Sequence, residues 1–101
     1  GIFINAGVIA NAKSYISDNV IVNTGAIIEH EVLIQSHVNI GPGVKIGGRV
    51  IIGESVYIGI GCSIVHSINI GSASIIGAGS VIIRDIKKKS TVVGIPGKEI
   101  T

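Results

Sequence analysis

An aliphatic residue recurs at every sixth position of this 101-residue chain, from Ile4 to Ile82, without a single insertion. The series contains only Ile, Val and Ala: Ile4, Ala10, Ile16, Val22, Ile28, Ile34, Ile40, Ile46, Ile52, Ile58, Ile64, Ile70, Ile76 and Ile82. The residues two positions earlier, from Ile2 to Ser80, are all small or β-branched. A period of six fits neither an α-helix nor an alternating strand. It predicts a short strand and a corner that repeat as a solenoid.

The amino-acid composition supports an all-β chain. The sequence has 24 Ile and 12 Val but only one Leu, and it has no Met or Trp. β-Branched residues favour strands, whereas helices favour residues such as Ala, Leu and Glu. The single cysteine, Cys62, excludes an internal disulfide and a cysteine-rich zinc site, and we expect it to be a buried structural thiol.

Three hexads close a triangle, so one coil takes about 18 residues and positions 18 apart stack on the same edge. One such column contains His30, Gly48 and His66, and another contains Pro42, Ile60 and Ala78. We expect the large Ile side chains to point inward over about four to five coils spanning residues 1–83. Gly or Asn follows the inward residue in nine hexads, and we expect these positions to take left-handed backbone angles at the corners. The period ends after Ile83, so residues 84–101 are expected to form an exit loop and an extended tail.

Charge and hydropathy argue against two classes of partner. The net charge is +2, the only dense basic run is 87–89, and the three aromatic residues offer no stacking platform for bases. Residues 55–83 lack charged side chains, but they contain five Gly and six Ser, and their period does not fit a membrane helix. We therefore expect a cytoplasmic protein that binds neither nucleic acid nor membrane.

The pattern of Ile or Val, Gly, two variable residues, and Val or Ser resembles the hexapeptide-repeat acyltransferases, whose fold is a left-handed parallel β-helix that trimerises. A narrower set of segments is similar to the sialic-acid O-acetyltransferase family, which includes the bacterial UDP-4-amino-sugar N-acetyltransferases: NTGAIIEHE (23–31), PG (42–43), GGRVIIG (47–53), GIGCSIV (59–65), IIGAGSVIIRDI (75–86) and VGIPGKEI (93–100). The resemblance implies an acetyl-CoA-dependent acetyltransferase that acts on an amino or hydroxyl group of a sugar or UDP-sugar. The N-terminal nucleotide-sugar-binding domain of that family has no counterpart here, and the chain contains no Met. We therefore expect the chain to be part of a longer protein.

The resemblance also implies a catalytic group. In that family the His of the IEHE-type motif is the general base and the acidic residue after it raises its basicity, which here are His30 and Glu31. A neutral imidazole suits this role near pH 7. Gly48, one coil beyond His30, corresponds to the glycine that faces the thioester, where its N–H is suited to hold the developing oxyanion. The alternative is a solvated His–Glu pair at a surface corner and an ordinary turn glycine.

Further family positions imply contacts with the donor. Asn39 stands where the family commonly has a ligand-contacting His, and Ile60 and Ala78 belong to stretches that bind coenzyme A through backbone amides. Arg84 and the lysines at 87–89 have the charge to meet coenzyme A phosphates, but a solvated exit loop is the favoured explanation for them. The resemblance implies a homotrimer with the donor between adjacent subunits, and no metal.

Two other functions compete with this interpretation. Carbonic anhydrases of the γ type share the hexapeptide fold and bind zinc through three His, two of them 36 residues apart, as His30 and His66 are. The third ligand of that family would fall at Gly71, which cannot bind the metal. A trimeric scaffold without catalysis is the other alternative, whereas an ice-binding face would need regular Thr ladders and the chain has only three Thr.

Overall fold

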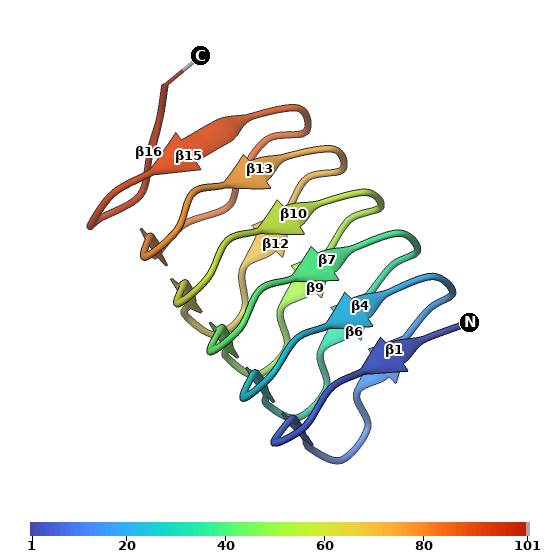
Figure 1. Cartoon of the computed structure of the whole chain (residues 1–101). Helices are drawn as coiled ribbons and strands as arrows, with labels where there is room; N and C mark the ends of the chain where they lie inside the picture. The colour runs from blue at the N-terminus through green and yellow to red at the C-terminus, as the bar shows by residue number, and fades with distance from the viewer. Residues whose placement is uncertain (101) are drawn as a thin grey trace.

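The chain forms a short triangular prism of stacked coils, about 31 × 20 × 20 Å (Figure 1). The computed structural model describes residues 1–100; Thr101, the last residue of the expected tail, lies outside the described part. Residues 1–100 contain only strands, turns and irregular segments. No helix among these residues has the length and apolarity needed to cross a bilayer.

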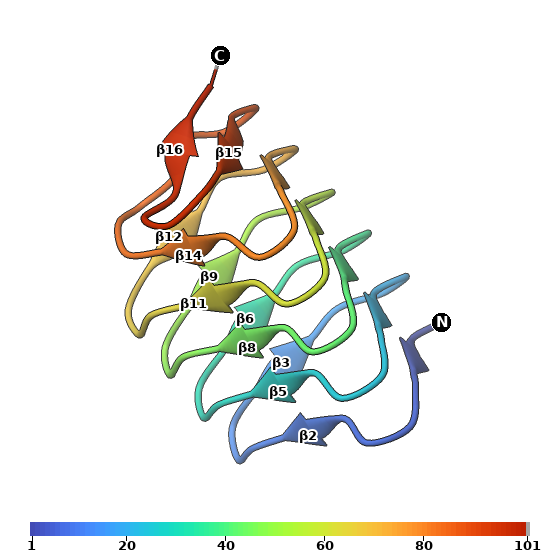
Figure 2. The same cartoon turned by 60° about the vertical axis from the view of Figure 1, so that its left-hand side comes forward.

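The three sides of the prism are parallel sheets, which we call faces A, B and C (Figures 1 and 2). Face A consists of β1 (Phe3–Ile4), β4 (Ile21–Val22), β7 (Asn39–Ile40), β10 (Tyr57–Ile58), β13 (Ile75–Ile76) and β15 (Thr91–Val93), with β16 (Lys98–Glu99) added antiparallel to β15. Face B consists of β2 (Ile9–Ala10), β5 (Ile27–Ile28), β8 (Lys45–Ile46), β11 (Ser63–Ile64) and β14 (Val81–Ile82). Face C consists of β3 (Tyr15–Ile16), β6 (Leu33–Ile34), β9 (Ile51–Ile52) and β12 (Asn69–Ile70).

Each strand pairs with the strand 18 residues further along the chain. Phe3 aligns with Ile21 on face A, and Ile28 aligns with Ile46 on face B. The predicted coil of three hexads is therefore confirmed. In Figure 1 the chain crosses the near face from right to left as the coils climb from the N-terminus to the C-terminus, which makes the coil left-handed.

The inward series forms the core. From Val22 to Ile82 every member of the six-residue series is buried, as are the small residues from Val20 to Ser80 beside it. Burying one such Ile contributes about 1.5–3 kcal/mol, so the stacked columns supply most of the hydrophobic stabilisation. The first coil is different: Ile4 is 53% exposed because no coil covers it on its N-terminal side.

Cys62 occupies a small inward position and is fully buried, as predicted. Its Sγ lies 3.0 Å from the carbonyl oxygen of Gly77 on the next coil. Burial raises the pKa of the thiol above its ordinary value, although backbone hydrogen bonds oppose this effect in part.

The predicted position of the left-handed residue at each corner is wrong by two residues. The glycines directly after the inward residue do not have positive φ, and the left-handed residue is the third after the inward one, as in Glu31 (φ 60°) and Arg49 (φ 59°). Glycine is needed for a different reason: a Cβ at Gly47 would lie 2.6 Å from the backbone nitrogen of His66 on the next coil. Close stacking of successive coils, rather than chain reversal, selects glycine there.

The period breaks after β14, where it was expected to end. Ile70 pairs with Ile86, only 16 residues later, so this last corner is two residues shorter than the others. The Asp85 carboxylate accepts a hydrogen bond of 2.9 Å from the Asn69 N–H. On the preceding coil the equivalent N–H, that of Ile51, donates to a backbone carbonyl instead. The tail then adds β15 and β16, and buried Val92 closes this end of the core.

Candidate active site

The edge between faces B and C carries the predicted catalytic column. Successive corners present His30, Gly48 and His66 at the same position, and each backbone is bonded to the next: Arg49 N–H donates to the His30 carbonyl (3.0 Å), and Ser67 N–H donates to the Gly48 carbonyl (2.9 Å). We call this the B–C edge. The 18-residue coil therefore places the three residues as the sequence predicts.

The His30 imidazole lies directly over Gly48. A Cβ placed on Gly48 would be 2.9 Å from Cε1, 3.3 Å from Nδ1 and 3.4 Å from Nε2 of the ring. The edge of the ring that carries both nitrogens thus faces the glycine, and only the missing side chain makes room for it. Among residues 1–100 the Gly48 N–H donates no hydrogen bond. An imidazole and an unbonded amide donor are therefore adjacent on this edge, where the His30 side chain is exposed and Gly48 is buried.

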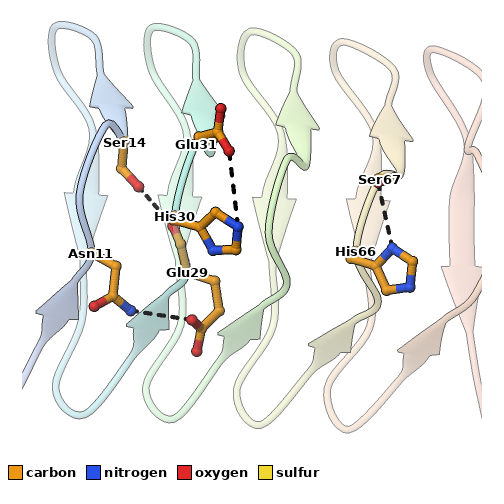
Figure 3. A network of polar contacts seen from close by, with 7 residues as sticks. All are labelled: Asn11, Ser14, Glu29, His30, Glu31, His66 and Ser67. Carbon is orange, nitrogen blue, oxygen red and sulfur yellow. Dashed lines mark hydrogen bonds and ion pairs between the residues drawn. The ribbon is translucent and has the colours of Figure 1, made fainter.

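Glu31 approaches the ring at Nε2. Its Oε1 is 3.9 Å from His30 Nε2, which is within ion-pair range but too long for a hydrogen bond (Figure 3). The left-handed φ of Glu31 turns the chain immediately after His30. Both side chains are about half exposed, so a direct ion pair between them contributes little to stability.

The preceding coil, to the left of the His30 coil in Figure 3, holds the corner that carries His30. The Ser14 hydroxyl donates to the Glu29 carbonyl at 2.7 Å, and the Asn11 side-chain amide donates to Glu29 Oε1 at 3.2 Å. Sequence reasoning missed both residues. Ser14 stands in a column in which half of the residues are Val, and this polar residue among them is the signal that could have identified it.

His66 lies on the same edge, with Gly48 between it and His30. Its Nδ1 is 3.4 Å from Ser67 Oγ, and Figure 3 shows its ring displaced from its own coil in the same direction as that of His30. Residues 1–100 bring together no cluster of three or more His, Cys, Asp or Glu side chains that could hold a metal ion.

The predicted donor-binding residues occupy a different edge, between faces A and B. Gly61 N–H donates to Pro42 and Gly79 N–H donates to Ile60, so Pro42, Ile60 and Ala78 stack on successive corners of this A–B edge. The backbone N–H groups of Ile60 and Ala78 donate no hydrogen bond within the described part of the chain. Such unpaired amides suit an extended ligand made of amide groups.

Asn39 lies on β7, half a coil away from His30 along the chain. It is half-buried on the outer side of face A, and its Oδ1 accepts a hydrogen bond of 3.4 Å from Asn23. Face A is opposite the B–C edge, so one chain does not bring Asn39 and His30 together. No pocket forms among the described residues of a single chain.

No protein-family model and no curated protein sequence matches the chain. Solved structures do match. A histidine-to-alanine variant of GDP-perosamine N-acetyltransferase from Caulobacter crescentus, solved with CoA and GDP-perosamine, is 34% identical with a TM-score of 0.99, and the match covers 100% of this chain and 48% of that one. The acetyltransferase domain of PglB from Neisseria gonorrhoeae, solved with acetyl coenzyme A, is 32% identical with a TM-score of 0.82, and the match covers 98% and 54%.

A third structure, serine acetyltransferase from Neisseria gonorrhoeae, is 31% identical with a TM-score of 0.87 over 94% of this chain and 41% of that one. The chain spans about half the length of these proteins. The resemblance seen in the hexads is confirmed by these matches. In repeat and fold the chain matches the β-helix of the hexapeptide-repeat acetyltransferases.

Proposed function

We propose that this β-helix catalyses the transfer of an acetyl group from acetyl-CoA to an amino group of a sugar or sugar nucleotide. The observation that carries the proposal is the His30 imidazole placed over Gly48, beside an amide N–H that makes no bond within residues 1–100. The proposed donor is supported by the perosamine N-acetyltransferase and PglB structures, which were solved with CoA and acetyl coenzyme A. The proposed acceptor is supported by the GDP-perosamine bound in the first of them.

The chemistry follows from these groups. The acceptor nitrogen attacks the thioester carbonyl, and His30 removes the proton that the nitrogen releases. The Gly48 N–H stabilises the negative charge that develops on the carbonyl oxygen. The carbon–sulfur bond then breaks, and the CoA thiolate leaves and takes up a proton. Glu31, 3.9 Å from the ring, stabilises the imidazolium formed in the first step.

The working site is proposed to lie between subunits of a homotrimer. His30 and Gly48 lie on the B–C edge, whereas Ile60 and Ala78 lie on the A–B edge of the same chain, so a donor that touches both sets has to contact two copies. Face A offers an apolar surface for such packing, with four exposed side chains in one column: Phe3, Ile21, Tyr57 and Ile75. Exposed Val93 lies on the last strand of this face, outside that column. The same face carries Asn39, which a neighbouring copy brings to the ligand.

Thiol release tests the proposed function. Purified protein is incubated with acetyl-CoA and a panel of nucleotide-linked amino sugars, and free CoA thiol is measured with a chromogenic disulfide. We expect release that depends on one acceptor with a free amino group, and no release with the corresponding sugar that carries only hydroxyl groups. Release with the hydroxyl sugar would instead indicate O-acetylation. A correctly assembled trimer that releases no thiol with any acceptor would support the scaffold alternative.

A further inference from the structure

Ser14 departs from its column at the coil directly before the candidate base. Seven of the fourteen positions in that inward column are Val, and a Val side chain would fill the space of Ser14 with an extra methyl group. Ser14 is half-buried, and its hydroxyl points to the next coil, where it donates to the Glu29 carbonyl at 2.7 Å (Figure 3). The bond therefore joins the core column to the corner that carries His30.

The Glu29 carbonyl belongs to the same planar peptide group as the His30 nitrogen. A hydrogen bond that fixes the direction of this carbonyl also fixes the plane of the peptide, and so restrains the His30 backbone on the N-terminal side of its Cα. The peptide on the C-terminal side of the His30 Cα is held by two backbone hydrogen bonds. The Glu31 N–H donates to the Ala12 carbonyl at 3.2 Å, and the His30 carbonyl accepts from the Arg49 N–H at 3.0 Å. Ser14 thus completes the restraint of the residue that carries the imidazole.

The equivalent carbonyls at other corners differ in their restraint: on the B–C edge those of Gly47 and Val65 accept no hydrogen bond within residues 1–100. On the A–B edge the corresponding carbonyls of Asn23, Gly41, Gly59 and Gly77 each accept a hydrogen bond of 3.3–3.4 Å from the backbone N–H three residues later. The equivalent bond from Val32 to Glu29 is absent within residues 1–100. The shorter bond from the Ser14 hydroxyl takes its place, so removing that hydroxyl leaves this carbonyl without a protein donor.

We propose that Ser14 is a positioning residue, whose hydroxyl orients the Glu29–His30 peptide so that the imidazole faces Gly48. This inference rests on the proposed function for its effect on catalysis. Ser14 does not touch the reacting groups: it lies on the coil before His30, whereas Gly48 lies on the coil after it. Its loss is therefore expected to lower kcat and to leave the KM for acetyl-CoA unchanged.

A matched pair of substitutions tests this role. Ser14→Thr keeps the hydroxyl and Ser14→Val replaces it with a methyl group, while the two side chains have nearly the same shape. We expect the Thr variant to retain the kcat of the wild type and the Val variant to lose about tenfold, with similar Tm values and the same trimer. Ser74 provides the control pair: this buried residue donates its hydroxyl to the Lys87 carbonyl and accepts a hydrogen bond from the Ser90 N–H, on a corner far from His30. Ser74→Val and Ser74→Thr are expected to have equal kcat values.

The positioning role would be overturned if Ser14→Val kept the wild-type kcat, or if the Thr and Val variants lost activity equally. A second readout does not depend on turnover: in NMR spectra the His30 ring signals are expected to shift in Ser14→Val and to stay in place in Ser14→Thr. Unchanged ring signals in Ser14→Val would refute the positioning role. Failure of the proposed function is recognised separately, because wild-type protein would then release no thiol.

Discussion

Replacing His30 with Ala is expected to lower kcat by about 10²–10⁴-fold, the usual contribution of a general base. The side chain is 56% exposed, so the coil stack and the trimer should remain intact. The KM for acetyl-CoA should stay within about twofold, because the predicted donor contacts of Ile60 and Ala78 lie on another edge. Single-turnover thiol release, together with Tm and molecular mass, measures each of these quantities.

A suitable control for this substitution is His37→Ala. His37 is also an exposed corner histidine, but it lies on the edge between faces C and A. It is expected to keep the wild-type kcat. A His30→Ala protein with full activity would remove the proposed mechanism, whereas equal losses at both positions would indicate a general effect of losing surface histidines.

Two neighbouring glycines are expected to respond to Ala in opposite ways. Gly48→Ala places a methyl group 2.9 Å from Cε1 of the exposed His30 ring, which can move aside. The φ of Gly48 lies outside the left-handed region, so the backbone accepts Ala and the variant should be as stable as the wild type, or more stable by about 0.4–1 kcal/mol. The displaced imidazole should cost about 10²-fold in kcat.

Gly47→Ala directs its methyl group at the backbone instead, 2.6 Å from the His66 nitrogen and 2.9 Å from its Cα. Backbone atoms of the next coil cannot rotate away, so this variant should lose about 1–3 kcal/mol of unfolding free energy. Denaturant unfolding and steady-state kinetics on both variants separate the two effects. A fully active Gly48→Ala enzyme would show that the ring does not need its position over this residue.

The repeat was predictable because one physical constraint, a closed coil of three hexads, acts uniformly along the sequence. It placed Ile28 above Ile46 in the core and His30 beside Gly48 on the edge, and both are confirmed. The handedness required the family resemblance, since the period alone is the same for either hand.

The remaining features depend on contacts that a period does not encode. The glycine at position 47 is needed because the next coil is close, and sequence reasoning attributed it to backbone conformation. The short corner before Ile86 depends on the Asp85 carboxylate replacing a backbone carbonyl. The hydrogen bond from Ser14 to Glu29 joins two coils, and a serine in this inward column does not by itself identify its partner.

The placement of Asn39 also required the three-dimensional structure. The family resemblance puts it near the catalytic histidine, but a separation of nine residues is half a coil and leads to the opposite face. The roles assigned to Asn39, Ile60 and Ala78 therefore depend on how copies of the chain pack together, which neither the repeat nor one chain determines.

A crystal structure of the protein with CoA bound tests the central claim most directly. We predict that the CoA sulfur lies within about 4 Å of both the His30 ring and the Gly48 nitrogen, since reacting groups have to approach to near contact. The pantetheine arm should lie along the Ile60 and Ala78 amides of an adjacent copy. A sulfur atom bound away from the B–C edge, with His30 facing only solvent, would contradict the account.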